Sequence, residues 1–247
     1  MKILLLAFIS LTINCFSSLQ AQVSSVVNVS MYALNIGEEM NTVTLNDPVS
    51  MGFRNDFEAI EGGPYYNDEW LKGRVVLKSG QVVGSEWLFK YNTFQDELHI
   101  QLKSGNVKIP VKEQIQSFMI EKDGKQHYFV NSAQTGIVEK EDNVFFEVLH
   151  SERFTLLKKS SKHYGELESD EFYCSTCNNT PFSFFFVSEK YYVKDRKGKF
   201  KSLKLTKKSI SNALPKSQYL FINSYWKKNR NKMKTEQGLL DLLQHIE

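Results

Sequence analysis

Leu77-Lys-Ser-Gly80-Gln-Val82 recurs in the sequence as Leu102-Lys-Ser-Gly105-Asn-Val107, and looser versions follow at Lys122-Asp-Gly124-Lys125 and Arg196-Lys-Gly198-Lys199. Each version places a glycine where a tight hairpin needs a positive φ, which only glycine adopts without steric cost. Consecutive hairpins of this kind build an antiparallel meander. The four turns therefore predict a chain that is mainly β, with an antiparallel sheet.

The stretches around these turns alternate between polar and apolar residues, as half-buried strands do. Aromatic residues make up 13% of the chain, with 18 Phe and 11 Tyr, and favour sheets over helices. The turns are spaced too irregularly for a propeller or a solenoid, so a sandwich, a roll or an open barrel is expected. The predicted strands are 74–77, 85–91, 97–102, 107–109, 115–120, 126–130, 144–149, 154–157, 182–187 and 191–193.

The overall composition is that of a globular protein. The chain has 247 residues, 41% of them hydrophobic and 24% charged, which is enough for a sizeable core and excludes wholesale disorder, collagen-like sequence and a polytopic membrane protein.

The N-terminus has the pattern of a secretory signal peptide. Lys2 precedes an apolar run, 3–16, that is too short to span a bilayer, and a small residue follows at Ala21. We expect cleavage after Ala21 and an exported protein, whether periplasmic, associated with the outer membrane or secreted. The alternatives are an N-terminal core element and lipidation at Cys15, although Asn14 stands where a lipidation signal has a small residue.

Cys174 and Cys177 are the remaining cysteines. Two nearby cysteines usually pair in an oxidising compartment, so we predict a disulfide that shapes a turn. A redox dithiol and a zinc half-site are the alternatives. The first would need a helix start beside the cysteines, and the second would need more ligands than the scattered histidines offer.

The C-terminal part of the chain changes to helical periodicity. Thr206 is expected to cap a short helix that ends before Pro215, and Thr235 is expected to cap the last helix. The chain should therefore divide into a signal peptide, 1–21, a β-rich domain, 22–205, and a basic helical segment, 206–247, packed on that domain. The apolar residues expected to face the core are Tyr219, Ile222, Trp226, Met233, Leu239, Leu242, Leu243 and Ile246.

Charge separates the same regions. Residues 190–234 hold 15 Lys or Arg against one acid, whereas residues 22–189 hold 15 against 24 acids. We expect the basic stretch to pack on the acidic body through its apolar face and to leave a cationic surface outward, with Lys227, Lys228 and Arg230. Such a surface fits an anionic envelope component or another envelope protein, with a membrane-surface role as an alternative. Export argues against nucleic acid.

No catalytic motif is present. The sequence lacks a phosphate-binding glycine loop, a Gly-x-Ser-x-Gly elbow and a His-Glu-x-x-His pair. The five histidines are dispersed, and adjacent carboxylates in a strand point to opposite faces, so no acid–base dyad follows from them. We expect no cofactor and no metal, assign no catalytic residue, and leave open whether the chain is an enzyme.

The strongest local pattern joins Gly62-Gly-Pro-Tyr65, Trp70 and Gly73 to Lys90-Tyr91-Asn92-Thr-Phe94-Gln-Asp96-Glu97. In these residues the chain resembles a family of uncharacterised secreted proteins of Bacteroidetes-type bacteria, in which Arg and Tyr are usual at the positions of Lys90 and Phe94. The resemblance covers about residues 60–130 and, more weakly, the Lys-rich C-terminus. It implies export and a β-rich fold, and the family has no assigned activity to transfer.

A structural role explains this pattern physically. Tyr65 and Trp70 are expected to be aromatic plugs under the first hairpin. Tyr91 flanks a turn in which Asn92 adopts a positive φ and Asp96 accepts bonds from local N–H groups. Ligand recognition is the alternative, which makes these five residues the candidate binding residues.

The favoured function is therefore an exported, non-enzymatic protein, either envelope-associated or a binding module. A secreted hydrolase acting on glycan or peptide is the first alternative. A redox or metal protein that uses Cys174 and Cys177 is the second.

Overall fold

The computed structural model describes residues 42–44, 60, 62–84, 86–139, 142–167, 182–194 and 198–246. All of them belong to one compact unit, Gly37–Glu247. The predicted signal peptide with Cys15, and both Cys174 and Cys177, lie outside the described residues.

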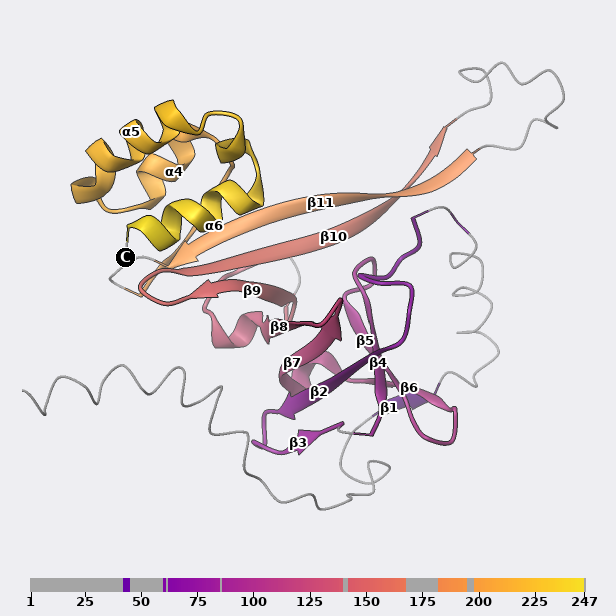
Figure 1. Ribbon diagram of the computed structural model, residues 1–247. Helices are drawn as coiled ribbons and strands as arrows, with labels where there is room; N and C mark the ends of the chain where they lie inside the picture. The colour runs from indigo at the N-terminus through magenta and orange to yellow at the C-terminus, as the bar shows by residue number, and fades with distance from the viewer. Residues whose placement is uncertain are drawn as a thin grey trace, which may run out of the picture. The chain divides into compact units, whose positions relative to one another are not determined.

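The described strands form a 12-stranded sheet in the order β1-β6-β5-β4-β2-β7-β8-β9-β10-β11-β12, with β3 paired to β2 off this path (Figure 1). Every pairing between the described strands is antiparallel, and the described α-helices follow the last strand. The predicted fold class is confirmed. The strands are β1 (Thr42–Thr44), β2 (Leu71–Leu77), β3 (Val82–Val83), β4 (Leu88–Asn92), β5 (Glu97–Gln101), β6 (Val107–Pro110), β7 (Ile115–Lys122), β8 (Lys125–Asn131), β9 (Phe145–Ser151), β10 (Thr155–Leu167), β11 (Phe182–Lys194) and β12 (Phe200–Leu203).

The two Leu-Lys-Ser-Gly turns have the same geometry, as their sequences predict. Gly80 and Gly105 have φ angles of 86° and 85°, and the N–H of each donates to the carbonyl of the leucine three positions earlier at 2.8 Å. A side chain at this φ would be strained, so glycine is required at both turns.

Strand β2 connects strands β4, β5 and β6 on one side of the sheet to strands β7, β8 and β9 on the other. Its first two residues pair with β4, and the rest of the strand, from Gly73, pairs with β7. A Cβ atom at Gly73 would lie 2.3 Å from the carbonyl oxygen of Met119 and 2.9 Å from the ring of Phe89. The glycine therefore lets β2 approach both neighbours at the point where the sheet turns.

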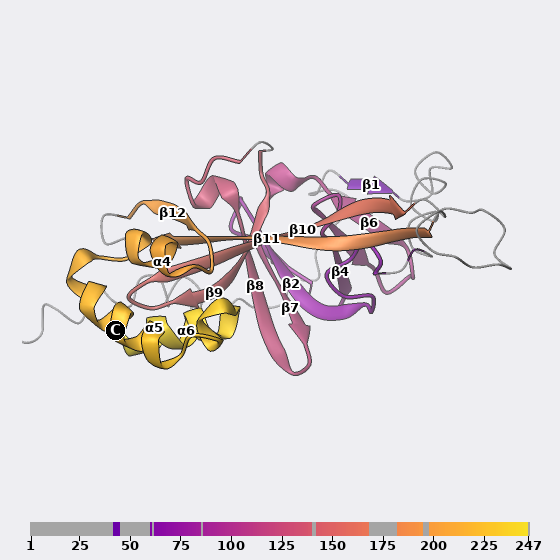
Figure 2. The same cartoon turned by 90° about the horizontal axis from the view of Figure 1, so that it is seen from above.

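The β10–β11 hairpin is longer than the sequence predicts. Each strand has 13 residues and the two pair along their whole length, whereas the prediction ended β10 at residue 157 and split β11 into two pieces. The prediction failed because polar and charged residues interrupt both apolar runs. Within the hairpin, β9 pairs with only four residues of β10, Thr155–Lys158, and β12 pairs with only four residues of β11, Tyr191–Lys194. The hairpin therefore extends past both neighbouring strands (Figure 2).

Three helices follow the sheet: α4 (Lys207–Ala213), α5 (Tyr219–Lys228) and α6 (Glu236–His245). Thr206 and Thr235 cap α4 and α6, accepting the N–H groups of Ser209 at 3.4 Å and Gly238 at 3.2 Å, which confirms both predicted caps. Among the described residues, no helix combines the length and the apolar character needed to cross a bilayer.

The helices pack on the ends of β10, β11 and β12 that lie away from the hairpin tip (Figures 1 and 2). One correction applies to the predicted apolar face: Tyr219 is exposed, whereas Trp226 is half-buried and packs against the core. The buried residues of this core are Phe154, Leu156, Tyr191, Val193, Leu203, Ile210, Ala213, Leu214, Ile222, Met233, Leu239, Leu242, Leu243 and Ile246.

A cluster of aromatic rings joins β4 to β7, β8 and β9. Phe118 and Phe129 stack with their centroids 4.6 Å apart, and Tyr91 and Phe145 meet Phe118 edge-on at 5.2 and 5.0 Å. Such edge-to-face contacts are favourable beyond the area they bury. The cluster fixes the ring of Tyr91, and with it the position of the Tyr91 hydroxyl.

Candidate functional site

The two halves of the sequence pattern lie side by side. Tyr65 forms an isolated antiparallel bridge with Asn92, and the N–H of Tyr66 donates to the carbonyl of Tyr91 at 2.8 Å. The carbonyl of Pro64 accepts the N–H and the hydroxyl of Thr93 at 3.0 and 3.1 Å. The Gly-Gly-Pro-Tyr segment is therefore the support on which the β4–β5 turn is built.

Asn92 shapes this turn through its side chain. Its Oδ1 accepts the N–H groups of Phe94 at 3.0 Å and Gln95 at 2.9 Å. The expected positive φ at Asn92 is wrong: Asn92 ends strand β4, and Asp96 has the positive φ, at 57°. An asparagine can reverse a chain through its side-chain oxygen alone, and here the strained backbone position lies four residues later.

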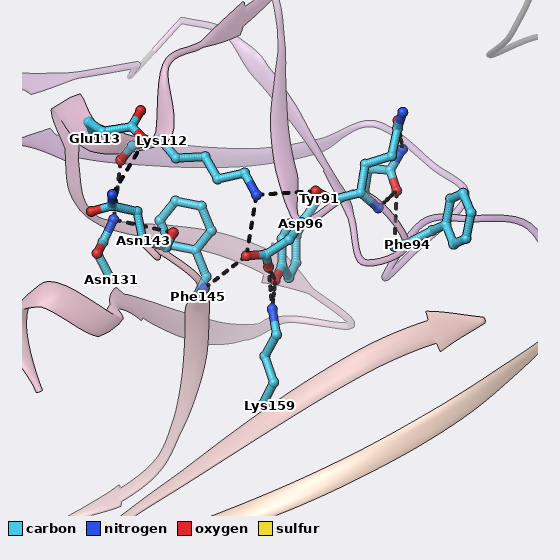
Figure 3. A network of polar contacts seen from close by, with 11 residues as sticks. Tyr91, Phe94, Asp96, Lys112, Glu113, Asn131, Asn143, Phe145 and Lys159 are labelled. Atoms are coloured by element: carbon cyan, nitrogen blue, oxygen red, sulfur yellow. Dashed lines mark hydrogen bonds and ion pairs between the residues drawn. The ribbon is translucent and has the colours of Figure 1, made fainter. Parts of the chain in front are cut away.

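Asp96 is the centre of a buried polar network (Figure 3). The residue is 5% exposed. Its Oδ1 accepts the hydroxyl of Tyr91 and the ammonium group of Lys159, and its Oδ2 accepts the N–H of Phe145 at 3.3 Å. The expectation that Asp96 accepts local N–H groups is therefore wrong, because its partners come from β4, β9 and β10.

A second ammonium group approaches the same carboxylate. Nζ of Lys112 lies 3.8 Å from Oδ2 of Asp96 and donates to the carbonyl of Gln95 at 3.3 Å. Nδ2 of Asn131 donates to the carbonyl of Lys112 at 3.1 Å and so fixes the short 3-10 turn Lys112–Gln114 that carries this lysine. Two positive charges thus face one negative charge inside the fold.

Tyr91 is held as a neutral donor in this network. Burial, together with the charge of Asp96 and the hydrogen bond to it, raises the pKa of Tyr91 well above its ordinary value of 10.0. The hydroxyl therefore keeps its proton at every physiological pH. Both carboxylate oxygens of Asp96 accept hydrogen bonds from other residues of the protein. The carboxylate therefore joins the turn to β9 and β10.

A second buried carboxylate, Glu147 on β9, has partners of a different kind. Its Oε1 lies 2.7 Å from Nδ1 of His127 and accepts the hydroxyl of Tyr66 at 3.1 Å. A carboxylate only accepts, so the hydrogen of His127 is assigned to Nδ1. Burial and the charge of Glu147 raise the pKa of Tyr66 above its ordinary value.

Lys158 joins this second cluster to the last helix. Its Nζ lies 3.1 Å from Oε2 of Glu147, 3.0 Å from Oε2 of Glu236 and 4.0 Å from Oε1 of Glu189. Burial lowers the pKa of Lys158, but the charges of Glu147 and Glu236 outweigh burial and the net shift is upward. Because Glu236 lies in the first turn of α6, this ammonium group ties that helix to β9 and β11.

Lys162, farther along β10, binds the glycine pair. Its ammonium group donates to the carbonyls of Gly62 and, at 2.7 Å, Gly63. Burial lowers the pKa of Lys162, against a smaller opposing effect of Asp68. The positive φ angles of Gly62 and Gly63, 86° and 46°, turn the chain at the point where these carbonyls meet the lysine.

Two of the predicted binding residues lie around a different cation. Nζ of Lys90 is 4.1 Å from the ring centroid of Tyr65 and 5.8 Å from that of Trp70. Tyr65 also meets the ring of His99 edge-on at 5.5 Å. Tyr65 and Trp70 therefore flank Lys90, while Tyr91, Asn92 and Asp96 build the turn.

The predicted basic surface lies on the helical segment. Lys227 and Lys228 end α5, and Arg230 follows two residues later; all three are exposed. Lys232 is exposed as well and pairs with Asp241 of α6. This surface and the Asp96 network are formed by different elements.

Sequence reasoning missed the partners of both carboxylates. Lys158 and Lys159 interrupt an apolar strand, and Glu147 stands inside Phe145-Phe-Glu-Val-Leu149. A charged residue within an apolar run needs a partner, which is the signal that could have found them. The pairing itself depends on the register of β9 with β10. Within the described residues, no group of three or more His, Cys, Asp and Glu side chains is placed to hold a metal ion.

No family model, curated protein or solved structure matches this chain. The resemblance to uncharacterised secreted proteins therefore stays a prediction, and the function is argued from the residues.

Proposed function

We propose that this chain is an exported, non-enzymatic module of the cell envelope that binds an anionic envelope component through its C-terminal helical segment. Export is supported by Lys2, the apolar run 3–16 and Ala21, which have the pattern of a signal peptide.

The observation that carries the binding proposal is the division of side chains on residues 206–234, the first part of the helical segment. Its apolar anchors, such as Ile210, Ile222 and Met233, are completely buried. Its sequence contains no Asp or Glu. The exposed cations are Lys207, Lys208, Lys216, Lys227, Lys228, Arg230, Lys232 and Lys234. A rigid surface of one charge sign attracts and orients a partner of the opposite sign.

The state of the buried carboxylates supports a binding module over a hydrolase. A catalytic acid or base must reach the proton that it transfers. Asp96 and Glu147 are each only 5% exposed, and their oxygens face hydroxyl, ammonium, imidazole or backbone groups of the fold. Both carboxylates therefore have a structural role and no catalytic role in this proposal.

Fractionation of cells that express the tagged full chain tests the proposal. We expect an exported product that starts at Gln22 and leaves the envelope fraction at raised salt, because exposed charges are screened. The variant Lys227→Glu, Lys228→Glu, Arg230→Glu should be released at lower salt. A matched control reverses three exposed lysines of the sheet: Lys72→Glu, Lys78→Glu and Lys125→Glu.

Two results would overturn the proposal. One is an intact Met1 on protein in the cytoplasmic fraction. The other is equal release of the two triple variants, because retention would then depend on total charge and not on the helical segment.

A further inference from the structure

The first turn of α5 leaves three large apolar side chains in water. Tyr219, Leu220 and Phe221 are 53%, 81% and 37% exposed. The next residue, Ile222, is completely buried and anchors the helix in the core. The exposed residues precede the anchor, and α5 packs toward α4 and the core of the helical segment through the face that carries Ile222.

This apolar turn shares a face with the lysines that end the helix. At 3.6 residues per turn, Leu220, Ser224 and Lys227 lie on one face, and Ile222 lies on the other. Phe221 and Lys228, seven positions apart, lie beside that outward face. Helix α5 therefore has an inner apolar face toward the core and an outer face that is apolar at its start and cationic at its end.

We infer that this outer face rests on an anionic phospholipid surface, with Tyr219, Leu220 and Phe221 entering the boundary between headgroups and acyl chains. Lys216, Lys227 and Lys228 then lie against the headgroups. The inference rests on the proposed function and names its partner.

A lipid surface satisfies both halves of the patch at once. It offers anionic headgroups to the lysines and an apolar layer to the side chains between them. A polyanionic glycan takes up the charges but leaves Leu220 in water, and Leu220 has neither a polar atom nor a flat ring to offer a sugar. The most exposed of the three residues thus favours lipid.

The helix is already formed before it meets the surface. Ile222 and Met233 hold it in the core, so binding does not have to order a disordered segment. One helical turn of apolar residues and a few lysines give reversible attachment, in contrast to a spanning helix.

Co-sedimentation of the purified protein with vesicles tests the inference. We expect binding to mixed phosphatidylcholine and phosphatidylglycerol vesicles and much weaker binding to phosphatidylcholine alone. Leu220→Ser should weaken binding to the mixed vesicles about tenfold, through the loss of buried hydrocarbon. The triple reversal at Lys227, Lys228 and Arg230 should weaken it by about 100-fold or more. The matched control is Val138→Ser, which removes an apolar side chain that is 92% exposed and lies outside the helical segment.

A heparin column separates the inference from the proposed function on which it rests. Leu220→Ser should elute from heparin at the salt concentration of the wild type, whereas the triple reversal should elute earlier. Heparin binding without vesicle binding, or equal vesicle binding by Leu220→Ser and wild type, would overturn the lipid inference and leave anionic binding standing. Failure to bind either probe would overturn both.

Discussion

Asp96 and Lys159 face each other in the interior, whereas Lys227 and Lys228 stand in water at the end of α5. In the β4–β5 turn, Asp96 has partners on β4, β9 and β10, and these contacts join the turn to the rest of the sheet. At the end of α5, Lys227 and Lys228 are exposed, and the buried apolar side chain of Ile222 anchors the helix in the core. The difference separates charge that builds the fold from charge that is free to meet a partner.

This comparison has an energetic basis. Breaking a buried ion pair leaves one charge without water or partner, and costs about 3–5 kcal/mol. Exposed pairs contribute about 0–1 kcal/mol each. Substitutions in the Asp96 network should therefore have a large effect on stability and a small effect on binding. Substitutions of the exposed cations should have a small effect on stability and a large effect on binding.

The largest effect is expected for Asp96→Asn. The variant keeps the side-chain shape and tolerates the positive φ, but removes the negative charge that Lys159 and Lys112 approach. We expect the free energy of unfolding to fall by about 3–5 kcal/mol, measured by urea denaturation. Asp123→Asn is the control, because Asp123 has a similar φ, 52°, and is exposed. It should change stability by about 0.5 kcal/mol or less. Equal effects of the two variants would mean that the network does not stabilise the fold.

Buried and exposed side chains of α5 allow the same comparison within one helix. Ile222→Ala opens a cavity in the core beneath the helix and should cost about 2–5 kcal/mol. Tyr219→Ala removes a larger side chain that is 53% exposed in the first turn of the helix, and should cost about 0.5 kcal/mol or less. Trp226→Ala should lie between them, because Trp226 is half-buried. Thermal melting of the three variants measures the order, and a larger loss for Tyr219→Ala would show that the first turn of α5 is part of the core.

Alkaline pH should weaken the interior. Tyr91 and Tyr66 keep their protons in the folded state above the ordinary pKa of 10.0, whereas the unfolded chain loses them there. The unfolded state then binds fewer protons, so stability is fully present below pH 10 and falls as pH rises above it. The slope should reach about 1.4 kcal/mol per pH unit for each tyrosine.

Tyr91→Phe removes one of these two tyrosines, so its stability should fall less steeply than that of the wild type above pH 10. Urea denaturation across this range measures both slopes. Lys158, whose pKa is also raised, keeps part of the dependence in the variant. Parallel slopes for variant and wild type would contradict the assignment of Tyr91 as a buried donor.

The sequence predicts local features well because their causes are local. Gly80 and Gly105 need only a positive φ, and Thr206 and Thr235 need only the N–H groups three positions later. The partners of Asp96 could not be predicted in this way. Lys159 is 63 positions away in the chain and reaches Asp96 only because β10 continues beyond β9.

Which side chains of a short helix are buried also depends on contacts with neighbouring elements, and helical periodicity does not specify these contacts. Tyr219, Ile222 and Trp226 have the spacing of one apolar stripe, yet Tyr219 is exposed. The stripe is correct for Ile222, but the first turn of α5 extends past the core that covers it. Helical spacing thus identifies a face, and the neighbouring elements decide how much of it is covered.

The smallest effect on stability, and the largest on binding, is expected for the triple reversal Lys227→Glu, Lys228→Glu, Arg230→Glu. All three side chains are exposed, so their reversal leaves the core of the helical segment unchanged. The acidic body, with 24 acids against 15 basic residues over 22–189, attracts these cations only weakly across water and salt. The free energy of unfolding should therefore change by about 0.5 kcal/mol or less, measured by urea denaturation at physiological salt. A loss comparable to that of Ile222→Ala would mean that the cations hold the segment to the body, and the division between charge that builds the fold and charge that meets a partner would fail at this surface.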